Sequence, residues 1–446
     1  MQIQQFYDSF LAHASYAILS EGEIVLIDPA RNPQPYYDFT RKNHAKIIAV
    51  IETHPHADFI SSHAEISITT GAKVYVSKLV NPGYKFSGFD DGDVIKVGKL
   101  SLTAINTPGH SPDSISVLLT NEVGQTHAVF TGDTLFLGDV GRPDLREKVG
   151  DIQQKREDLA KAMYHSLRNK LMILPPETII YPAHGAGSLC GKNMSKETSG
   201  TIGQELANNY ALQPMSEDSF VKLLLKDQPF VPKYFPQAVE LNKKGAKSFS
   251  ESINSILRIK SVERNRETVI IDTRPQEIFK QGHIPGSINN QEGTKFETWL
   301  GSILSPGESF YLIAKDETTA EDLIKRIASI GYEDRLEAYM TEVSGKLKKS
   351  SLPDLNDFEL NPSNYTIVDI RNAGEVKNGK IFEQALTIPL YELRERLSEI
   401  PTDKPIMVHC AGGYRSAAGS SIIEAGLNLP VYDLSEAIHQ FNLAIS

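Results

Sequence analysis

Histidines and aspartates in four short segments are the residues of this 446-residue chain best suited to metal chemistry. The candidates are His54, His56 and Asp58 in the first segment, His110 in the second, Asp133 in the third and His184 in the fourth. Imidazole and carboxylate ligands suit zinc or iron, and two histidines with one carboxylate and open positions are typical of non-haem Fe(II) oxygenases. Each segment follows an apolar, strand-like run, so loops at one edge of a sheet can bring these groups together. The four segments therefore predict a metal site.

Phe59 sets how many metal ions we expect. Residues 53–59 read THPHADF, a His-x-His-x-Asp-His pattern whose last histidine is replaced by phenylalanine. A phenyl ring cannot ligate a metal, so we expect one ion and chemistry other than two-metal hydrolysis. His63 is predicted to belong to a helix rather than to replace the missing ligand, and His127 to be packed or exposed within a strand.

A cysteine loop provides the second candidate site. Cys410 lies in the sequence HCAGGYRS, between a predicted strand and a helix expected to begin near Ala417. Backbone N–H groups of such a loop form an anion-binding nest that stabilises a persulfide or a sulfur oxyanion, and Arg415 adds fixed positive charge. The expected contacts of the bound group are Ala411, Gly412, Gly413 and Tyr414. The loop predicts nucleophilic sulfur chemistry at Cys410.

The elements that must position these groups fall into two regions. In the first 240 residues the predicted strands are 16–19, 24–28, 46–51, 73–76 and 128–130. With the helical stretches between them they predict an αββα sandwich. Proline spacing over residues 228–236 predicts a structured connector after it.

An internal repeat occupies the last 200 residues. Residues 268–274 are echoed by 366–371, and each copy alternates strand and helix, which predicts two small α/β domains with mostly parallel sheets. We place them at residues 250–348 and 352–446. Counting back from the shared helix end puts Lys315 at the position of Cys410, and the loop of the first copy has no glycine. The first copy is therefore predicted to be catalytically silent.

Composition excludes several classes of partner. The formal net charge of -10 gives no electrostatic attraction to nucleic acid or an anionic membrane. The sequence shows no apolar run of about 18 residues and no signal-peptide pattern at its start. Two cysteines do not make a disulfide framework, so we expect a reducing cytoplasm.

Residues 1–240 resemble the persulfide dioxygenase branch of the metallo-β-lactamase superfamily, relatives of glyoxalase II. The resemblance implies a single non-haem Fe(II) on His54, His110 and Asp133, with zinc as the alternative metal. The resemblance also implies that three neighbouring groups orient these ligands, namely His56, Asp58 and His184.

Two further residues near this site have alternative interpretations. Arg142, in a Gly-Arg-x-Asp stretch that the family shares, could bind a ligand carboxylate or a persulfide anion, or could pair with Asp144. Cys190, six residues after His184, is either an accessory thiol for persulfide handling or a structural cysteine.

Residues 352–446 resemble the rhodanese sulfurtransferases, whose loop cysteine carries a sulfane sulfur. The loop of protein tyrosine phosphatases also places an arginine five residues after its cysteine. That loop is longer than the one in this chain, and together with the upstream residues 368–371 this difference favours rhodanese. The whole chain resembles persulfide dioxygenase–rhodanese fusion proteins of sulfide detoxification. This implies oxidation of a low-molecular-weight thiol persulfide by O₂ to sulfite, and sulfur transfer through Cys410 that gives thiosulfate.

The whole-chain resemblance also bears on oligomeric state, and two other functions compete with the one that it implies. It implies a homo-oligomer, either a dimer or a tetramer. The competing enzyme class is a zinc-dependent hydrolase of the glyoxalase II type with accessory rhodanese domains. A persulfide-sensing or carrier scaffold is the non-enzymatic alternative.

Overall fold

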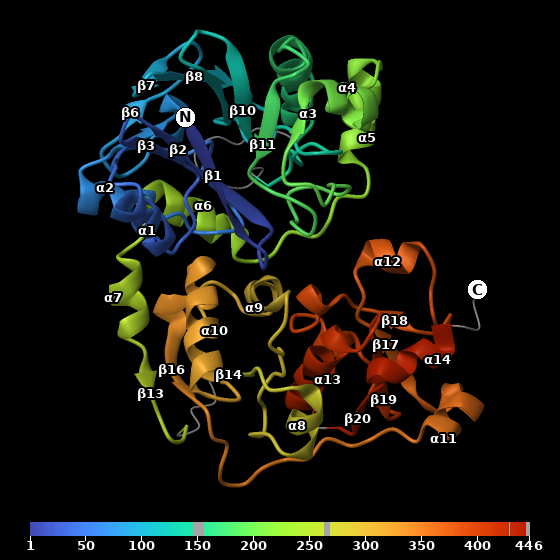
Figure 1. Ribbon diagram of the computed structural model, residues 1–446. Helices are drawn as coiled ribbons and strands as arrows, with labels where there is room; N and C mark the ends of the chain where they lie inside the picture. The colour runs from blue at the N-terminus through green and yellow to red at the C-terminus, as the bar shows by residue number, and fades with distance from the viewer. Residues whose placement is uncertain (146–155, 263–267, 428, 443–446) are drawn as a thin grey trace. The chain divides into compact units, whose positions relative to one another are not determined.

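The computed structural model describes residues 1–145, 156–262, 268–427 and 429–442, and the chain forms two compact units (Figure 1). One unit comprises Met1–Ser252 with Ala328–Gly331, and the other comprises Ile253–Ile327 with Tyr332–Ser446. The predicted boundaries at residues 240, 250, 348 and 352 remain predictions. None of the helices within the described ranges combines the length and apolar character needed to span a membrane.

Two six-stranded sheets form the framework of the first unit. The first sheet runs in chain order: β1 (Gln2–Asp8), β2 (His13–Ser20), β3 (Glu23–Ile27), β4 (Lys46–Ile51), β5 (Lys73–Val76) and β6 (Ser87–Gly88). The second runs in reverse chain order: β12 (Gly200–Thr201), β11 (Ile179–Pro182), β10 (Thr126–Gly132), β9 (Ile115–Thr120), β8 (Leu100–Asn106) and β7 (Val94–Val97). The five strands predicted in this region correspond to β2, β3, β4, β5 and β10.

The core between the sheets follows from alternation of apolar side chains. In β8, Leu100, Leu102 and Ala104 are buried, while the residues between them are partly exposed. These side chains join Ile18 and Val25 of the first sheet in one apolar cluster. Burial of this apolar surface holds the sheets face to face.

Helices cover the outer faces of both sheets. The helices of this unit are α1 (Gln34–Lys42), α2 (His63–Thr70), α3 (Arg156–Ser166), α4 (Ile202–Asn208), α5 (Glu217–Leu225) and α6 (Phe235–Lys244), with α7 (Phe249–Asn254) at its end. Tyr36 and Ile66 of α1 and α2 pack on the first sheet, and Met163 and Phe220 of α3 and α5 pack on the second. A π-helical turn, Leu167–Leu171, continues α3. The predicted αββα sandwich is confirmed.

The second unit contains two four-stranded parallel sheets, as the repeat predicted. The first has the order β13 (Leu257–Arg258), β16 (Leu336–Met340), β15 (Phe310–Ile313), β14 (Val269–Asp272), with α8 (Gln276–Gln281), α9 (Phe296–Ile303) and α10 (Glu317–Ser329). The second has the order β18 (Leu386–Thr387), β17 (Thr366–Asp369), β19 (Ile406–His409), β20 (Val431–Asp433), with α11 (Leu355–Leu360), α12 (Ala373–Lys377), α13 (Tyr414–Leu427) and α14 (Ile438–Asn442).

One ion pair at the end of a strand is repeated in both copies. Arg274 pairs with Asp272 at 2.6 Å, and Arg371 pairs with Asp369 at 2.7 Å. Each arginine also donates through Nη2 to the carbonyl oxygen eight residues further on, at 3.0 Å in both cases. The repeat noticed in the sequence therefore includes a shared structural brace at the end of β14 and β17.

Candidate metal centre and thiol site

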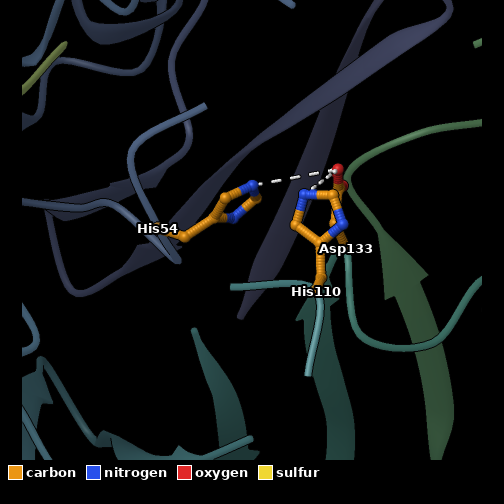
Figure 2. Close-up of side chains that lie close together, drawn as sticks. All are labelled: His54, His110 and Asp133. Carbon is orange, nitrogen blue, oxygen red and sulfur yellow. Dashed lines mark ion pairs between the residues drawn. The ribbon is translucent and has the colours of Figure 1, made fainter. Parts of the chain in front are cut away.

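Three of the predicted ligands converge on one point of the first unit (Figure 2). His54 follows β4, His110 follows β8 and Asp133 follows β10. Asp133 Oδ2 lies 3.8 Å from His54 Nε2 and 3.5 Å from His110 Nε2, and all three side chains are buried. We call these residues the triad. The structure brings together the three residues that the resemblance named.

The triad fits a metal ion. Ligand atoms about 2.0–2.2 Å from an ion lie roughly 3 Å from one another, so the observed spacings require only small inward movements. Asp133 Oδ2 is buried and accepts no hydrogen bond from any residue that the structure describes. A buried carboxylate oxygen without a donor is costly unless a cation compensates it. These donor groups suit a metal ion but do not distinguish iron from zinc.

The fourth segment supplies a histidine held between two carboxylates. His184 Nδ1 lies 2.7 Å from Asp133 Oδ1, and His184 Nε2 lies 2.7 Å from Asp58 Oδ2. Burial alone would lower the pKa of His184, but the charges of Asp133 and Asp58 outweigh it and raise this pKa well above the usual value. In turn, His184 holds the pKa of Asp133 well below its usual value despite the opposing effect of burial. His184 thus fixes the orientation of the carboxylate in the triad.

His56 points towards a carboxylate that the sequence had not singled out as functional. Its Nε2 lies 3.2 Å from Asp28 Oδ1. Asp28 also accepts hydrogen bonds from the backbone N–H of Thr53 at 2.7 Å and from its hydroxyl at 2.8 Å. Asp28 therefore anchors the start of the metal loop. The sequence offered one indication of this role, which is that Asp28 lies at the end of a predicted strand.

A second anchor comes from the helix after the proline-rich connector. The amide nitrogen of Asn242 in α6 donates to the carbonyl oxygens of His56 and Phe59, at 2.8 and 2.7 Å. Its oxygen accepts from the Ser61 backbone N–H at 2.8 Å. The Tyr234 hydroxyl donates to the Asp58 carbonyl at 2.8 Å. Sequence reasoning missed Asn242 and Tyr234 because they lie far along the chain from the motif.

Phe59 is buried where the motif would place its last histidine. Its ring centroid lies 3.8 Å from that of His13 and 4.4 Å from that of His56. The side chain is only 1% exposed and packs as an apolar wall against His13 and His56. This position supplies no donor for a second ion.

The two further histidines that the sequence raised, His63 and His127, lie outside the candidate metal groups found among the described residues. His63 begins α2, as expected, and its Nδ1 lies 3.6 Å from Glu52 Oε1. Burial lowers the pKa of His63 to about 3. His127 lies in β10 and is partly exposed.

Arg142 forms an ion pair with Asp144, which was one of the two interpretations of this residue. Its Nε and Nη2 donate to the two carboxylate oxygens of Asp144, both at 2.7 Å. Its Nη1 donates to the carbonyl oxygens of Leu189 and Phe230, both at 3.3 Å. The Arg142 side chain is 1% exposed. These contacts brace the loops on either side, and substrate binding by Arg142 remains a prediction.

Cys190 lies beside the metal site rather than in a remote core. Its sulfur and ligand atoms of Asp58 and His184 lie within 4.8 Å of one another. Burial raises the pKa of the Cys190 thiol well above its usual value, and the charges of Asp58 and Asp133 add to this effect.

The second site, in the second unit, is built from one short loop. Cys410 follows β19 and is buried, and the Gly413 N–H donates to its sulfur at 3.1 Å. Gly413 has φ of +96°, a conformation that glycine adopts without strain. The helix α13 begins at Tyr414, earlier than the expected start near Ala417. The loop therefore ends directly at a helix N-terminus, as an anion-binding nest requires.

The other loop residues differ in exposure and contacts. Ala411 and Gly412 are exposed, whereas the Tyr414 hydroxyl donates to the Gln291 carbonyl of the first repeat at 2.6 Å. Contacts of a bound sulfur species with these residues remain predictions.

Arg415 is held by an acidic partner. Its Nη1 and Nη2 donate to the two carboxylate oxygens of Glu375 at 2.5 and 2.7 Å. Burial opposes ionisation of Glu375, but the hydrogen bonds and charge of Arg415 outweigh it and hold the pKa of this carboxyl below its usual value. The pair fixes a positive charge one residue beyond the nest.

Strand register aligns the two repeats residue by residue. In the first repeat Asp272 pairs with Ile313 across β14 and β15. In the second, the equivalent Asp369 pairs with His409 across β17 and β19. The residue that follows Ile313 therefore corresponds to the residue that follows His409.

This alignment moves the sequence-based assignment by one position. Ala314, not Lys315, corresponds to Cys410, because Gly331 lies 17 residues after Ala314 whereas Gly426 lies 16 residues after Cys410. Counting from the helix ends had hidden this difference. Lys315 lies 3.1 Å from Glu292 in an ion pair. At either position the first repeat lacks a thiol.

The sequence matches two known families. Residues 8–184 match the metallo-beta-lactamase superfamily, and residues 259–335 and 354–444 match the rhodanese-like domain. A metallo-beta-lactamase from Staphylococcus aureus of known crystal structure is 32% identical, with a TM-score of 0.69. The similarity covers 76% of this chain and 98% of that protein. The two-family organisation predicted from the sequence is confirmed.

Curated relatives match the N-terminal region. A probable metallo-hydrolase of Burkholderia pseudomallei is 29% identical over 262 residues, which is 50% of this chain and 85% of that protein. The mitochondrial persulfide dioxygenase of Homo sapiens is 28% identical over 204 residues, which is 45% of this chain and 71% of that protein. By its N-terminal domain and the two repeats that follow, the chain belongs to the metallo-beta-lactamase superfamily and carries two rhodanese-like domains.

Proposed function

We propose that this chain oxidises a low-molecular-weight thiol persulfide with O₂ at a mononuclear non-haem iron and transfers sulfur through Cys410. The observation that carries the proposal is the buried triad of two histidines and one carboxylate. The similarity to human persulfide dioxygenase supports it, as do the rhodanese-like domains. The net oxidation consumes one persulfide, one O₂ and one water, and gives one thiol, one sulfite and two protons.

The residues around the triad have distinct tasks in this proposal. His54, His110 and Asp133 would hold the ion, and an iron held by three protein groups supplies open positions for small molecules and the associated oxygen chemistry. His184 orients Asp133 through the 2.7 Å contact to Oδ1. Phe59 occupies the motif position at which a histidine would bind a second ion. Its buried apolar ring limits water beside the reacting sulfur.

The second stage uses the Cys410 loop. The Cys410 thiolate takes a sulfane sulfur from a persulfide and becomes a persulfide itself, and the donor leaves as a thiolate. Sulfite then attacks the outer sulfur, so that thiosulfate is released and the Cys410 thiolate is restored. The Gly413 N–H and the charge of Arg415 stabilise the anionic groups at this loop. The first repeat, without a thiol, serves in packing or docking.

Metal analysis combined with oxygen uptake tests the proposal. Full-length protein purified without added metal is expected to contain about one iron per chain and to consume O₂ with a thiol persulfide. An oxygen electrode used across glutathione, coenzyme A, bacillithiol and cysteine persulfides would identify the carrier. A chain that contains zinc and no iron, and takes up no O₂, would instead support the zinc-dependent thioester hydrolase of the glyoxalase II type with accessory rhodanese domains.

A further inference from the structure

The first rhodanese-like repeat has no thiol of its own, yet one of its aromatic side chains reaches the cysteine loop of the second repeat. We propose that Trp299, in α9 of the first repeat, is a positioning residue for Arg415 and thereby for sulfur transfer at Cys410. The inference rests on the second stage of the proposed function and deepens it. It gives the first repeat a part in the chemistry in addition to packing.

The guanidinium of Arg415 contacts an acid and an aromatic ring that come from different repeats. Glu375 of the second repeat accepts from both terminal nitrogens of Arg415, at 2.5 and 2.7 Å. The guanidinium carbon also lies over the Trp299 ring, 5.9 Å from its centroid. A cation at this distance is attracted by the negative face of an aromatic ring, and tryptophan attracts it most strongly. Trp299 is 7% exposed, so little water competes for this contact.

The direction in which this guanidinium points matters for the thiol. Burial alone would lower the pKa of Arg415, but the hydrogen bonds and charge of Glu375 outweigh it, and the charges of Cys410 and Asp369 add to the rise. Glu375 also neutralises part of the positive charge that the thiol loop could use. The Trp299 ring attracts the guanidinium without neutralising it. Trp299 therefore keeps Arg415 in place while its charge remains available to anions at the loop.

A second contact from the first repeat holds the neighbouring residue. The Tyr414 hydroxyl donates to the Gln291 carbonyl oxygen at 2.6 Å. A methyl group added at Gly293 would lie 2.9 Å from Cε2 of Tyr414, so the Tyr414 ring rests directly on this backbone. Because α13 begins at Tyr414, these contacts fix the helix N-terminus beside the nest.

The segment that carries Trp299 is itself braced. Arg326 of α10 donates through Nε and Nη2 to the two carboxylate oxygens of Glu297, at 2.6 and 2.8 Å. The same Nη2 donates to the Gly293 carbonyl at 2.6 Å. Glu297 is buried and lies in α9, two residues before Trp299. The aromatic ring is thus presented by a rigid support, as a group that positions another must be.

A matched pair of substitutions isolates the aromatic face. Trp299→Phe and Trp299→Leu both remove the indole N–H and keep an apolar side chain, but only phenylalanine retains an aromatic ring. Sulfur transfer from thiosulfate to cyanide is measured in the full-length protein. Thiosulfate gives its outer sulfur to the Cys410 thiolate and leaves as sulfite, and cyanide removes that sulfur as thiocyanate.

Because Arg415 attracts the anionic donor, the effect should appear in KM. We expect the KM for thiosulfate to rise about 2- to 30-fold in Trp299→Leu and to stay within about twofold of the wild type in Trp299→Phe. The kcat should change little in either variant. Equal changes in the two variants would overturn the proposal, since a role in packing alone does not require an aromatic face.

A double-mutant cycle shows whether Trp299 acts through Arg415. Arg415→Lys keeps the positive charge and removes the planar group that lies over the ring. If the proposal holds, Trp299→Leu should have little further effect on KM in the Arg415→Lys background. Effects that simply add in the double variant would contradict it.

Tryptophan fluorescence provides a readout that leaves Trp299 unchanged, in case Trp299→Leu does not fold. Trp299 is the only tryptophan of the sequence, so the emission reports its surroundings. Arg415→Lys should alter the emission spectrum, whereas the exposed Glu383→Gln in the same repeat should not. An unaltered spectrum in Arg415→Lys would overturn the contact. A wild-type protein without sulfur transfer, but with the expected change in Arg415→Lys, would count against the proposed function and support the contact.

Discussion

The metal site and the thiol site are assembled in opposite ways. In the first unit, side chains from loops after β4, β8, β10 and β11 supply the donor groups, and anchors such as Asn242 come from still further along the chain. In the second unit, one loop between β19 and α13 provides the thiol and its nest. A site of the first kind depends on the whole sandwich. A site of the second kind depends on the sequence of a few consecutive residues.

The two rhodanese-like domains extend the comparison. Both have the same parallel strand pairing and the same Asp-x-Arg brace. The loop after the strand decides the chemistry, because Ala314 stands in the first domain where Cys410 carries the thiol in the second. The scaffold places the loop, and the loop sequence decides whether it has sulfur chemistry.

Loss of a triad ligand should have the largest effect. His110→Ala removes one of three buried donors, so we expect loss of bound iron and a fall in oxygen uptake of at least about 100-fold. Sulfur transfer from thiosulfate through Cys410 should remain. Elemental analysis, an oxygen electrode and a sulfurtransferase assay measure the three quantities. His127→Ala, which changes a partly exposed histidine of β10, is the matched control.

An equal loss of sulfur transfer in His110→Ala would show that the two sites are not independent and would break the comparison.

Cys410→Ser tests the other half of the comparison. Removal of the nucleophile should lower sulfur transfer by at least about 1000-fold, while persulfide-dependent oxygen uptake and iron content stay at the wild-type level. The product ratio of sulfite to thiosulfate, measured by chromatography, should shift towards sulfite. Full thiosulfate formation by this variant would contradict the role of Cys410.

Asn242→Ala probes the dependence of the metal site on a distant anchor. The variant leaves two carbonyl oxygens and one N–H of the metal loop without their partner, which should cost about 1–3 kcal/mol of folding free energy. Iron affinity should also fall about 10–100-fold. Thermal unfolding and competition with a chelator measure these effects. Asn208→Ala, at an exposed position of α4, is the control.

Glu375→Gln should have the smallest effect. Because Arg415 holds the pKa of Glu375 below its usual value, the ion pair is present at neutral pH and is lost as pH falls through that lowered pKa. We expect sulfur transfer about fivefold lower or less at neutral pH, and a flatter acid limb below pH 4.5, the ordinary pKa of a glutamate carboxyl. The exposed Glu383→Gln in the same domain should leave the pH profile unchanged. An unaltered profile in Glu375→Gln would argue against the positioning role.

Local patterns predicted most of the architecture. Alternating apolar residues indicated strands such as those that became β3 and β4, and the repeated residues 268–274 and 366–371 indicated two related domains. The metal ligands were recognisable because each follows a strand, and the fold brings such loops to one edge. The Lys315 assignment was wrong by one residue because the first repeat has one more residue between its strand end and the glycine after its helix, and counting back from the helix end conceals this difference.

The sequence by itself determined which residue types each site contains: two histidines and an aspartate for the triad, and one thiol before a helix. Only the tertiary structure decided their partners. It pairs Arg142 with Asp144, clamps the metal loop with Asn242 and brings Cys190 beside Asp58 and His184. The physical reason is that strand and loop patterns depend on neighbours along the chain. Contacts among buried polar groups depend on which distant segments pack together.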